Sequence, residues 1–278
     1  MSSWIEATPQ GLRDLAFDNL AAAPDGPVLL ARLAKASAVI RAQFPATMDL
    51  PYGSAPRARI DLLPGRVDMP CLVYFHGGYW QMNSREMFTA LAEGVRAHGW
   101  SAAFVGYTLA PEASLTAIVR EIGVAIDWLN ERSAASGVHG PLVAAGSSAG
   151  GLLAALALEH QVVIGGMAMS GIFELAPLRD TFLNVKLKLT DEEISDLSPI
   201  RRPVVAKPFA LAIGSAELPA VAANTYAFHA LRRFGGRCDP LVEVPGANHF
   251  SILEELRDPQ SALVHELLAV SNKVETTP

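Results

Sequence analysis

The chain has 278 residues, of which 50% are hydrophobic and 18% charged, and its formal net charge is −6. This composition excludes a disordered chain and suits one large α/β domain over residues 1–278 better than two independent domains. A negative charge without any basic block argues against nucleic acid or an anionic membrane as partner. A small-molecule substrate is the partner that we expect, and a homodimer stays open.

The cysteines and the N-terminus indicate in which cellular compartment the protein is expected. The chain has 2 cysteines, Cys71 and Cys238, which form neither a disulfide framework nor a metal-ligand spacing. We therefore expect no metal and no cofactor. The first residues lack a charged stretch followed by an apolar core, and the apolar runs are too short to span a bilayer. These features predict a cytoplasmic protein.

The N-terminal segment 1–48 is predicted to be helical and irregular. Apolar residues at helical spacing predict a helix over 27–40, which we expect to lie over the main sheet, where it could form part of a lid. No catalytic residue is expected in this segment.

From residue 49 onward, apolar strand-like runs alternate with helical patterns. Such a βαβ series, with its right-handed crossovers, predicts a mostly parallel sheet with helices on both faces. Residues 174–205 interrupt the series, with short helices expected at 181–184 and 191–194, and form a lid-like insertion. Strands are predicted at 58–63, 70–75, 102–107, 142–145, 162–170, 208–214 and 241–244, and helices at 84–98, 114–129, 151–158 and 220–234, with closing helices to about 270.

The sequence GSSAG at 146–150 joins a predicted strand to a predicted helix. This pattern is typical of a nucleophile elbow, in which the central serine, Ser148, stands on a tight turn that needs small neighbours. The N–H of Ala149, at the start of the helix, would then face a developing oxyanion. The alternative is a Gly/Ser turn that merely connects two elements.

The sequence HGGYW at 76–80 follows another buried strand. Glycines at such a strand end let backbone N–H groups approach a ligand, and we expect those of Gly78 and Tyr79 to complete an oxyanion hole. His76 precedes the serine and is interpreted as a brace for the loop rather than a base. Trp80 is either a core aromatic or part of the substrate pocket.

A nucleophilic serine needs a base, and the base needs an anion. In an α/β-hydrolase the chain order is serine, acid, histidine, each after its own strand. His249 is the histidine in a loop directly after the last predicted strand, and Glu217 follows the strand before it. Asp239 is the rival acid, but it lies at the opposite end of the last strand.

These motifs resemble those of the α/β-hydrolase superfamily and, within it, the arylformamidase (kynurenine formamidase)-like group, which shares ground with hormone-sensitive-lipase-type esterases. The similarity covers the chain from about residue 49. Lipase-type esterases usually carry a third glycine where Tyr79 stands. The resemblance rests on HGGYW at 76–80, YTLAP at 107–111, GSSAG at 146–150, LN at 183–184, SP at 198–199 and GANHF at 246–250.

The resemblance implies hydrolysis of an N-formyl anilide, or of a small aryl or acyl ester, through an acyl-serine at Ser148. His249 would move the proton, and Glu217 would orient His249. A carboxylesterase with the same residues, or a binding module that has lost its chemistry, are the alternatives. We expect the pocket wall to include Trp80, Phe182, Leu218 and Phe250.

Overall fold

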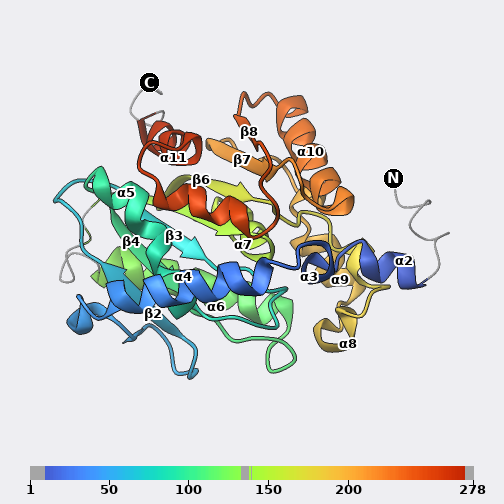
Figure 1. Ribbon diagram of the computed structural model, residues 1–278, viewed down its shortest axis with the longest axis horizontal. Coiled ribbons are helices and arrows are strands. Elements are labelled where there is room, and N and C mark those ends of the chain that lie inside the picture. Colours follow the sequence, from blue (N-terminus) through green and yellow to red (C-terminus); the bar gives the residue numbers. More distant parts are fainter. Residues whose placement is uncertain (1–9, 133–137, 139, 273–278) are drawn as a thin grey trace.

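The computed structural model describes residues 10–132, 138 and 140–272, so the first nine residues of the predicted segment 1–48 lie outside it. The described residues form an eight-stranded sheet in the order β1-β2-β4-β3-β5-β6-β7-β8 (Figure 1). The pairs β1–β2 and β2–β4 are antiparallel and the others are parallel, which confirms the predicted mostly parallel sheet. The strands are β1 Leu50–Pro51, β2 Arg59–Leu63, β3 Cys71–Phe75, β4 Ser101–Val105, β5 Leu142–Ser147, β6 Val163–Met169, β7 Phe209–Gly214 and β8 Leu241–Val244.

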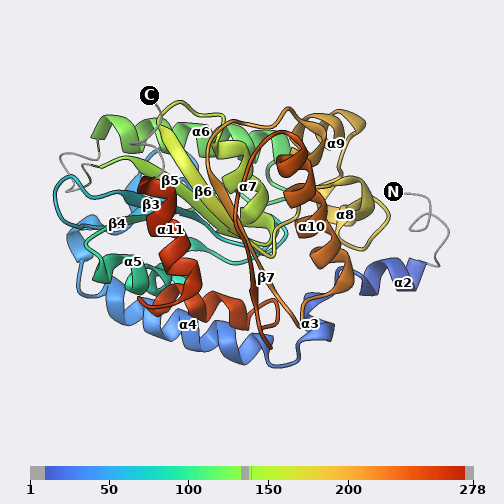
Figure 2. The same cartoon turned by 90° about the horizontal axis from the view of Figure 1, so that it is seen from above.

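Both faces of the central strands are buried. Along β3, Val73 belongs to one hydrophobic core and its neighbour Tyr74 to the other, because successive side chains point to opposite faces. Figure 2 shows the sheet between two layers of helices. One layer is α6 Leu115–Arg132, α7 Ala149–Ala157 and α10 Pro219–Phe234, and the other is α4 Gly26–Arg41, α5 Glu93–Ala97 and α11 Ala262–Asn272.

The long helix α6 follows its sequence pattern closely. Ser114 Oγ accepts the N–H of Ala117 at 3.2 Å, as expected of a capping residue. The apolar positions at helical spacing, among them Ile118, Ile122 and Leu129, are buried.

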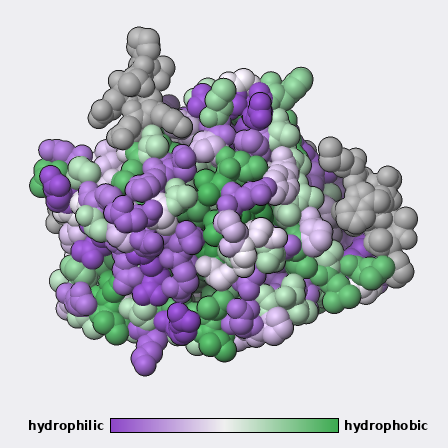
Figure 3. Space-filling view, turned by 45° about the horizontal axis from the view of Figure 1, so that its top comes forward, coloured by the Kyte–Doolittle hydropathy of each residue, from purple (hydrophilic) through white to green (hydrophobic). Residues whose placement is uncertain are grey.

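None of the described helices is long and apolar enough to cross a membrane. On the face in Figure 3, hydrophobic and hydrophilic side chains are interspersed.

The predicted helix 84–98 is wrong in its first half. Ser84 makes no side-chain capping bond, and two 3-10 turns replace the first helical turns. The reason is a contact with α4, where Ser37 Oγ accepts the N–H of Ala90 at 2.9 Å and donates to the carbonyl of Met87 at 2.9 Å. Backbone groups in this stretch therefore bond to another helix. The turns are Arg85–Met87 and Thr89–Ala92, and they precede α5.

Residues 10–22 and the insertion 174–205 lie together at one end of the sheet (Figure 1). The N–H of Phe182, in the insertion, donates to Asp14 Oδ1 at 2.8 Å, and Gln81 Nε2 donates to the carbonyl of Leu183 at 2.9 Å. The insertion thus contacts both residues 10–22 and the region that follows β3. The helices of these two segments are α2 Gln10–Leu15, α3 Asn19–Ala22, α8 Asn184–Leu187 and α9 Asp191–Leu197.

Candidate functional site

The turn between β5 and α7 holds Ser148 in a strained backbone conformation, with φ 53° and ψ −122°. Such a conformation in a non-glycine residue costs about 1–3 kcal/mol and persists only where the surroundings enforce it. The flanking glycines have no room for a side chain, since a Cβ on Gly146 would overlap the carbonyl of Gly150, and one on Gly150 would overlap that of Phe75. The GSSAG stretch is therefore built as an elbow with the serine at its tip.

The loop after β3 runs directly past this serine. A Cβ on Gly77 would lie 3.1 Å from Ser148 Cβ, and Gly78 adopts φ 117°, where a Cβ would lie 2.5 Å from the carbonyl oxygen of Met82. Tyr79 follows with φ 50°. Within residues 10–132 and 140–272, no hydrogen bond is found for the N–H groups of Gly78, Tyr79 and Ala149. These are the donors expected for an oxyanion hole, and they remain free to bind a ligand.

His76 is buried beneath this loop. Its Nδ1 lies 2.8 Å from the carbonyl oxygen of Gly77, and its ring stacks on Tyr107 and Phe88 at centroid distances of 4.3 and 5.8 Å. Burial lowers the pKa of His76 to about 4, so the imidazole is neutral at pH 7. This environment agrees with the interpretation of His76 as a brace for the loop.

This buried histidine makes stability depend on pH. In the unfolded chain its pKa returns to about 6.5, so between pH 6.5 and 4 the unfolded state binds a proton that the folded state does not. We expect the free energy of unfolding to fall by about 3 kcal/mol as pH drops through this window. Urea titrations at several pH values measure this free energy of unfolding. We expect it to depend less on pH in His76→Gln than in the native protein. An equal pH dependence in the two proteins would show that His76 is not the group responsible.

The loops after β7 and β8 bring an acid and a histidine together. Glu217 Oε2 lies 2.9 Å from Nδ1 of His249, and the side chains are 1% and 9% exposed. Burial raises the pKa of Glu217, but the hydrogen bond and charge of His249, the Ser170 hydroxyl and the Leu218 N–H outweigh it, and the pKa is lowered overall. Glu217 is therefore ionised at neutral pH, and its bond to Nδ1 leaves Nε2 of His249 for another partner.

Asp239, the other candidate acid, stabilises the fold instead. Asp239 Oδ2 forms a buried ion pair with Arg232 at 2.7 Å, and its Oδ1 accepts the N–H of Phe209 at 3.0 Å. These contacts lie at the start of β7 and β8, the end of the sheet opposite Glu217. Asp239 thus has no access to His249.

A cavity of about 600 Å³ connects the serine to the histidine. Ser148 and His249 both line it, although no hydrogen bond joins them among the described residues. Catalytic hydrogen bonds are often long in unliganded enzymes and tighten when substrate binds. Gly78 and Tyr79 of the candidate oxyanion loop also line this cavity.

The structure places two of the four predicted pocket residues at this cavity. Phe182 and Phe250 line the cavity. Trp80 does not, because its side chain is fully buried in the hydrophobic core. Leu218 does not either; it is the residue that begins α10, where its N–H donates to Glu217 Oε1 at 2.9 Å.

The N-terminal segment supplies cavity residues that sequence reasoning missed. Phe17, Asp18, Asn19, Leu20, Ala21 and Leu30 form one side of the cavity. Asp18 caps the short helix α3 through a bond from the N–H of Ala21 at 3.0 Å, and an Asp-Asn pair of this kind is a local signal for a helix start. Nothing in that signal indicates the distant partner against which the helix packs.

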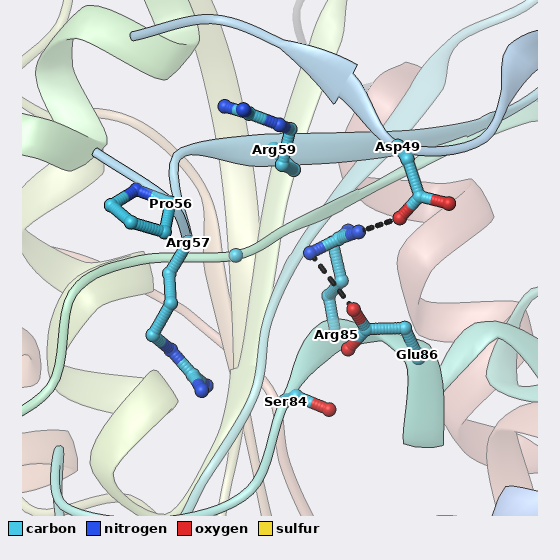
Figure 4. Close-up of a pocket in the computed structure, with 8 residues that line it drawn as sticks. Asp49, Pro56, Arg57, Arg59, Ser84, Arg85 and Glu86 are labelled. Carbon is cyan, nitrogen blue, oxygen red and sulfur yellow. Dashed lines mark hydrogen bonds and ion pairs between the residues drawn. The ribbon is translucent and has the colours of Figure 1, made fainter. Parts of the chain in front are cut away.

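A second cavity, of about 240 Å³, is lined by Arg57, Arg59 and Arg85 among others. Figure 4 shows Arg85 held between Asp49 and Glu86. Arg57 donates to the carbonyl oxygens of Tyr107 and Asn83. Because Asn83 Nδ2 in turn donates to the carbonyl of Gly77 at 3.2 Å, these contacts support the candidate oxyanion loop. No cluster of metal-ligating side chains is found in the described part of the chain.

Comparisons with known proteins agree with this geometry. A family model described as the alpha/beta hydrolase fold matches residues 72–277. The kynurenine formamidase of Danio rerio is 30% identical over 244 residues, which are 81% of this chain and 82% of that protein. A carboxylesterase of Mycobacterium tuberculosis, NlhH, is 31% identical over 127 residues, 44% of this chain and 38% of that protein.

A solved structure of a candidate thioesterase from Silicibacter superposes with a TM-score of 0.82 at 28% identity, covering 92% of this chain and 98% of that one. The family match spans well over half of the sequence, and the formamidase similarity extends into the region before it. The chain therefore belongs to the alpha/beta hydrolase fold family, in its arylformamidase and esterase group.

Proposed function

We propose that this hydrolase cleaves a small N-formyl or other aryl amide through an acyl-serine intermediate. One observation carries the proposal: an ionised, buried Glu217 is hydrogen-bonded to His249, and His249 and the strained Ser148 line the same cavity. A carboxylate on Nδ1 keeps a histidine in the tautomer whose Nε2 can take a proton from a hydroxyl.

In the first half-reaction, Ser148 Oγ attacks the carbonyl carbon while its proton passes to Nε2 of His249. The oxyanion that forms would accept hydrogen bonds from the N–H groups of Gly78, Tyr79 and Ala149. Collapse of this intermediate breaks the C–N bond, and the imidazolium of His249 returns the proton to the leaving amine. Glu217 stabilises the imidazolium throughout.

In the second half-reaction, a water molecule attacks the acyl-serine. Nε2 of His249 removes a proton from this water, and the same donors hold the second oxyanion. Release of the acid, formate in the case of a formamide, returns the proton to Ser148. The cavity of about 600 Å³ is in the usual range for a ligand of one or two rings, so an aryl leaving group fits its size.

A carboxylesterase acting on small aryl or short-chain acyl esters is the second candidate. The partial similarity to a carboxylesterase favours it, and the same residues would serve. The amine that leaves an amide must be protonated, whereas the alcohol or phenol that leaves an ester needs protonation much less. A binding module without chemistry is disfavoured, since such relatives typically lose a catalytic residue and here serine, acid and histidine are all present.

Steady-state turnover of N-formylkynurenine and p-nitrophenyl acetate by the purified protein tests the proposal. We expect kcat/KM for the formamide to equal or exceed that for the ester. An ester preference of several orders of magnitude would contradict the formamidase proposal and support the carboxylesterase. Turnover of neither, together with no labelling by a fluorophosphonate, would support the binding module.

A further inference from the structure

Tyr79 belongs to the candidate oxyanion loop, residues 76–83, but its side chain bonds to a different part of the chain. Its hydroxyl donates to the carbonyl oxygen of Phe17 at 2.7 Å and accepts a hydrogen bond from Nδ2 of Asn19 at 2.9 Å. A tyrosine hydroxyl can donate one hydrogen bond and accept others, so both contacts are satisfied in these directions. The loop is therefore bonded, through one side chain, to the segment that forms one side of the cavity at Ser148.

The environment of this hydroxyl argues against a role as acid or base. Tyr79 is 7% exposed, and burial raises the pKa of its hydroxyl well above the ordinary value, so the group keeps its proton at neutral pH. That proton is bonded to a backbone carbonyl oxygen, which neither supplies nor removes protons at neutral pH. The contribution of the hydroxyl is therefore to the geometry of the loop.

The loop needs such support because its backbone is strained. Gly78 adopts φ 117°. The non-glycine residues Tyr79, Trp80 and Asn83 adopt φ 50°, 58° and 70°, a region that side chains rarely occupy and keep only where the surroundings enforce it. Trp80 is fixed by its fully buried side chain, and Asn83 by its bond to the carbonyl oxygen of Gly77 at 3.2 Å. For Tyr79, the hydroxyl provides the corresponding contact.

The orientation of the loop decides where two backbone N–H groups point. Those of Gly78 and Tyr79 have no hydrogen-bond partner among the described residues, and the loop passes directly beside Ser148. Oxyanion donors act only when they are held at the place of the oxyanion, and a displacement of about 1 Å can cost about 10²-fold in rate. The ring and the N–H of Tyr79 share one Cα, so a fixed ring limits rotation of the backbone that carries the donor.

We propose that the hydroxyl of Tyr79 is a positioning group, which holds the N–H groups of Gly78 and Tyr79 at the oxyanion by anchoring the loop to Phe17 and Asn19. The inference rests on the proposed function, because attack by Ser148 is what creates the oxyanion. It gives residues 17–19 a part in the reaction beyond that of a cavity wall. Loss of the hydroxyl weakens transition-state binding and leaves substrate binding almost unchanged.

Tyr79→Phe tests the proposal, because it removes only the hydroxyl oxygen. Steady-state rates are measured with N-formylkynurenine and p-nitrophenyl acetate, and binding with phenylboronic acid, whose boron atom forms a tetrahedral adduct with a serine hydroxyl. We expect kcat to fall about tenfold to a hundredfold for any substrate that the native protein cleaves, with KM changed by less than about twofold. The Kd of phenylboronic acid should rise by a similar factor, because the adduct resembles the transition state.

Tyr52→Phe is the matched control. Tyr52 is also 7% exposed, and its hydroxyl also donates to a backbone carbonyl oxygen, that of Gly106, at 2.6 Å, but it does not line the cavity at Ser148. We expect this variant to lose a similar amount of thermal stability and to keep kcat and the Kd of phenylboronic acid within about twofold of the native values. Equal losses of kcat in the two variants, or an effect of Tyr79→Phe on KM alone, would overturn the proposal.

Asn19→Ala removes one of the two bonds of the Tyr79 hydroxyl and keeps the other. We expect a smaller fall in kcat than in Tyr79→Phe, and no further fall when both changes are combined, because Asn19 acts through that hydroxyl. Additive losses would contradict the proposal, and so would a native kcat in Asn19→Ala if Tyr79→Phe failed to fold. A native protein that cleaves neither substrate and does not bind phenylboronic acid would overturn the proposed function and this inference with it. An active native protein whose Tyr79→Phe variant keeps its kcat would overturn this inference alone.

Discussion

Ser148→Ala is expected to lower kcat/KM for a formanilide by a factor of about 10⁵ to 10⁶, because the hydroxyl of Ser148 is the proposed nucleophile and that of Ser147 is bonded to Tyr74 in the core. Alanine has the same Cβ as serine, so the strained φ of 53° imposes no new clash and the fold should persist. The small remaining activity would come from binding and from the oxyanion donors acting on water. Progress curves at high enzyme concentration, with circular dichroism as a check of folding, measure the effect.

Ser147→Ala is the matched control for this prediction. Ser147 precedes Ser148 and is equally buried, but its Oγ bonds to the hydroxyl of Tyr74 at 2.8 Å, within the core. Removing it leaves a buried tyrosine hydroxyl unpaired, so we expect a loss of about 1–3 kcal/mol in stability with little change in kcat. Comparable losses of activity in both variants would show that the nucleophile has been misassigned.

Glu217→Gln is expected to reduce kcat by a factor of about 10³ to 10⁴, with a smaller effect on KM. The amide has nearly the same shape as the carboxylate, but it cannot stabilise the imidazolium of His249. It can also donate to Nδ1, which would favour the tautomer whose Nε2 already carries a proton. Initial rates over a range of substrate concentrations separate kcat from KM.

Asp239→Asn provides the contrast, because Asp239 is the other acid that the sequence offered. Its loss leaves the buried Arg232 without its partner at 2.7 Å, which should destabilise the protein by about 3–5 kcal/mol. Folded Asp239→Asn protein should keep its kcat. An activity loss in this variant that exceeds the loss in Glu217→Gln would reverse the assignment of the acid.

The sheet and the core of the site were predictable because their signals are local. Apolar runs such as that of β3 predict buried strands, and the tight elbow demands small residues around Ser148. The ends of parallel strands meet at one edge of a sheet, so the positions of Glu217 and His249 after β7 and β8 sufficed to pair them. Chain order alone therefore predicted the acid–histidine contact.

The cavity wall was less predictable because it depends on distant contacts. Asn19 meets Tyr79 across 60 residues of chain, and no periodicity in either segment indicates the pairing. Trp80 shares the positive φ of Tyr79, and the local sequence does not reveal that one side chain enters the core while the other reaches the cavity. The interrupted helix after Ser84 likewise reflects its contact with Ser37 of α4.

The nucleophilic role of Ser148 is tested most directly by finding which atom a fluorophosphonate modifies. Intact-mass measurement followed by peptide mapping of the treated protein locates the adduct. We expect one phosphonyl group on Ser148, formed rapidly in the native protein, much more slowly in Glu217→Gln, and not at all in Ser148→Ala. A folded native protein that forms no adduct, or an adduct on another residue that persists in Ser148→Ala, would contradict that role.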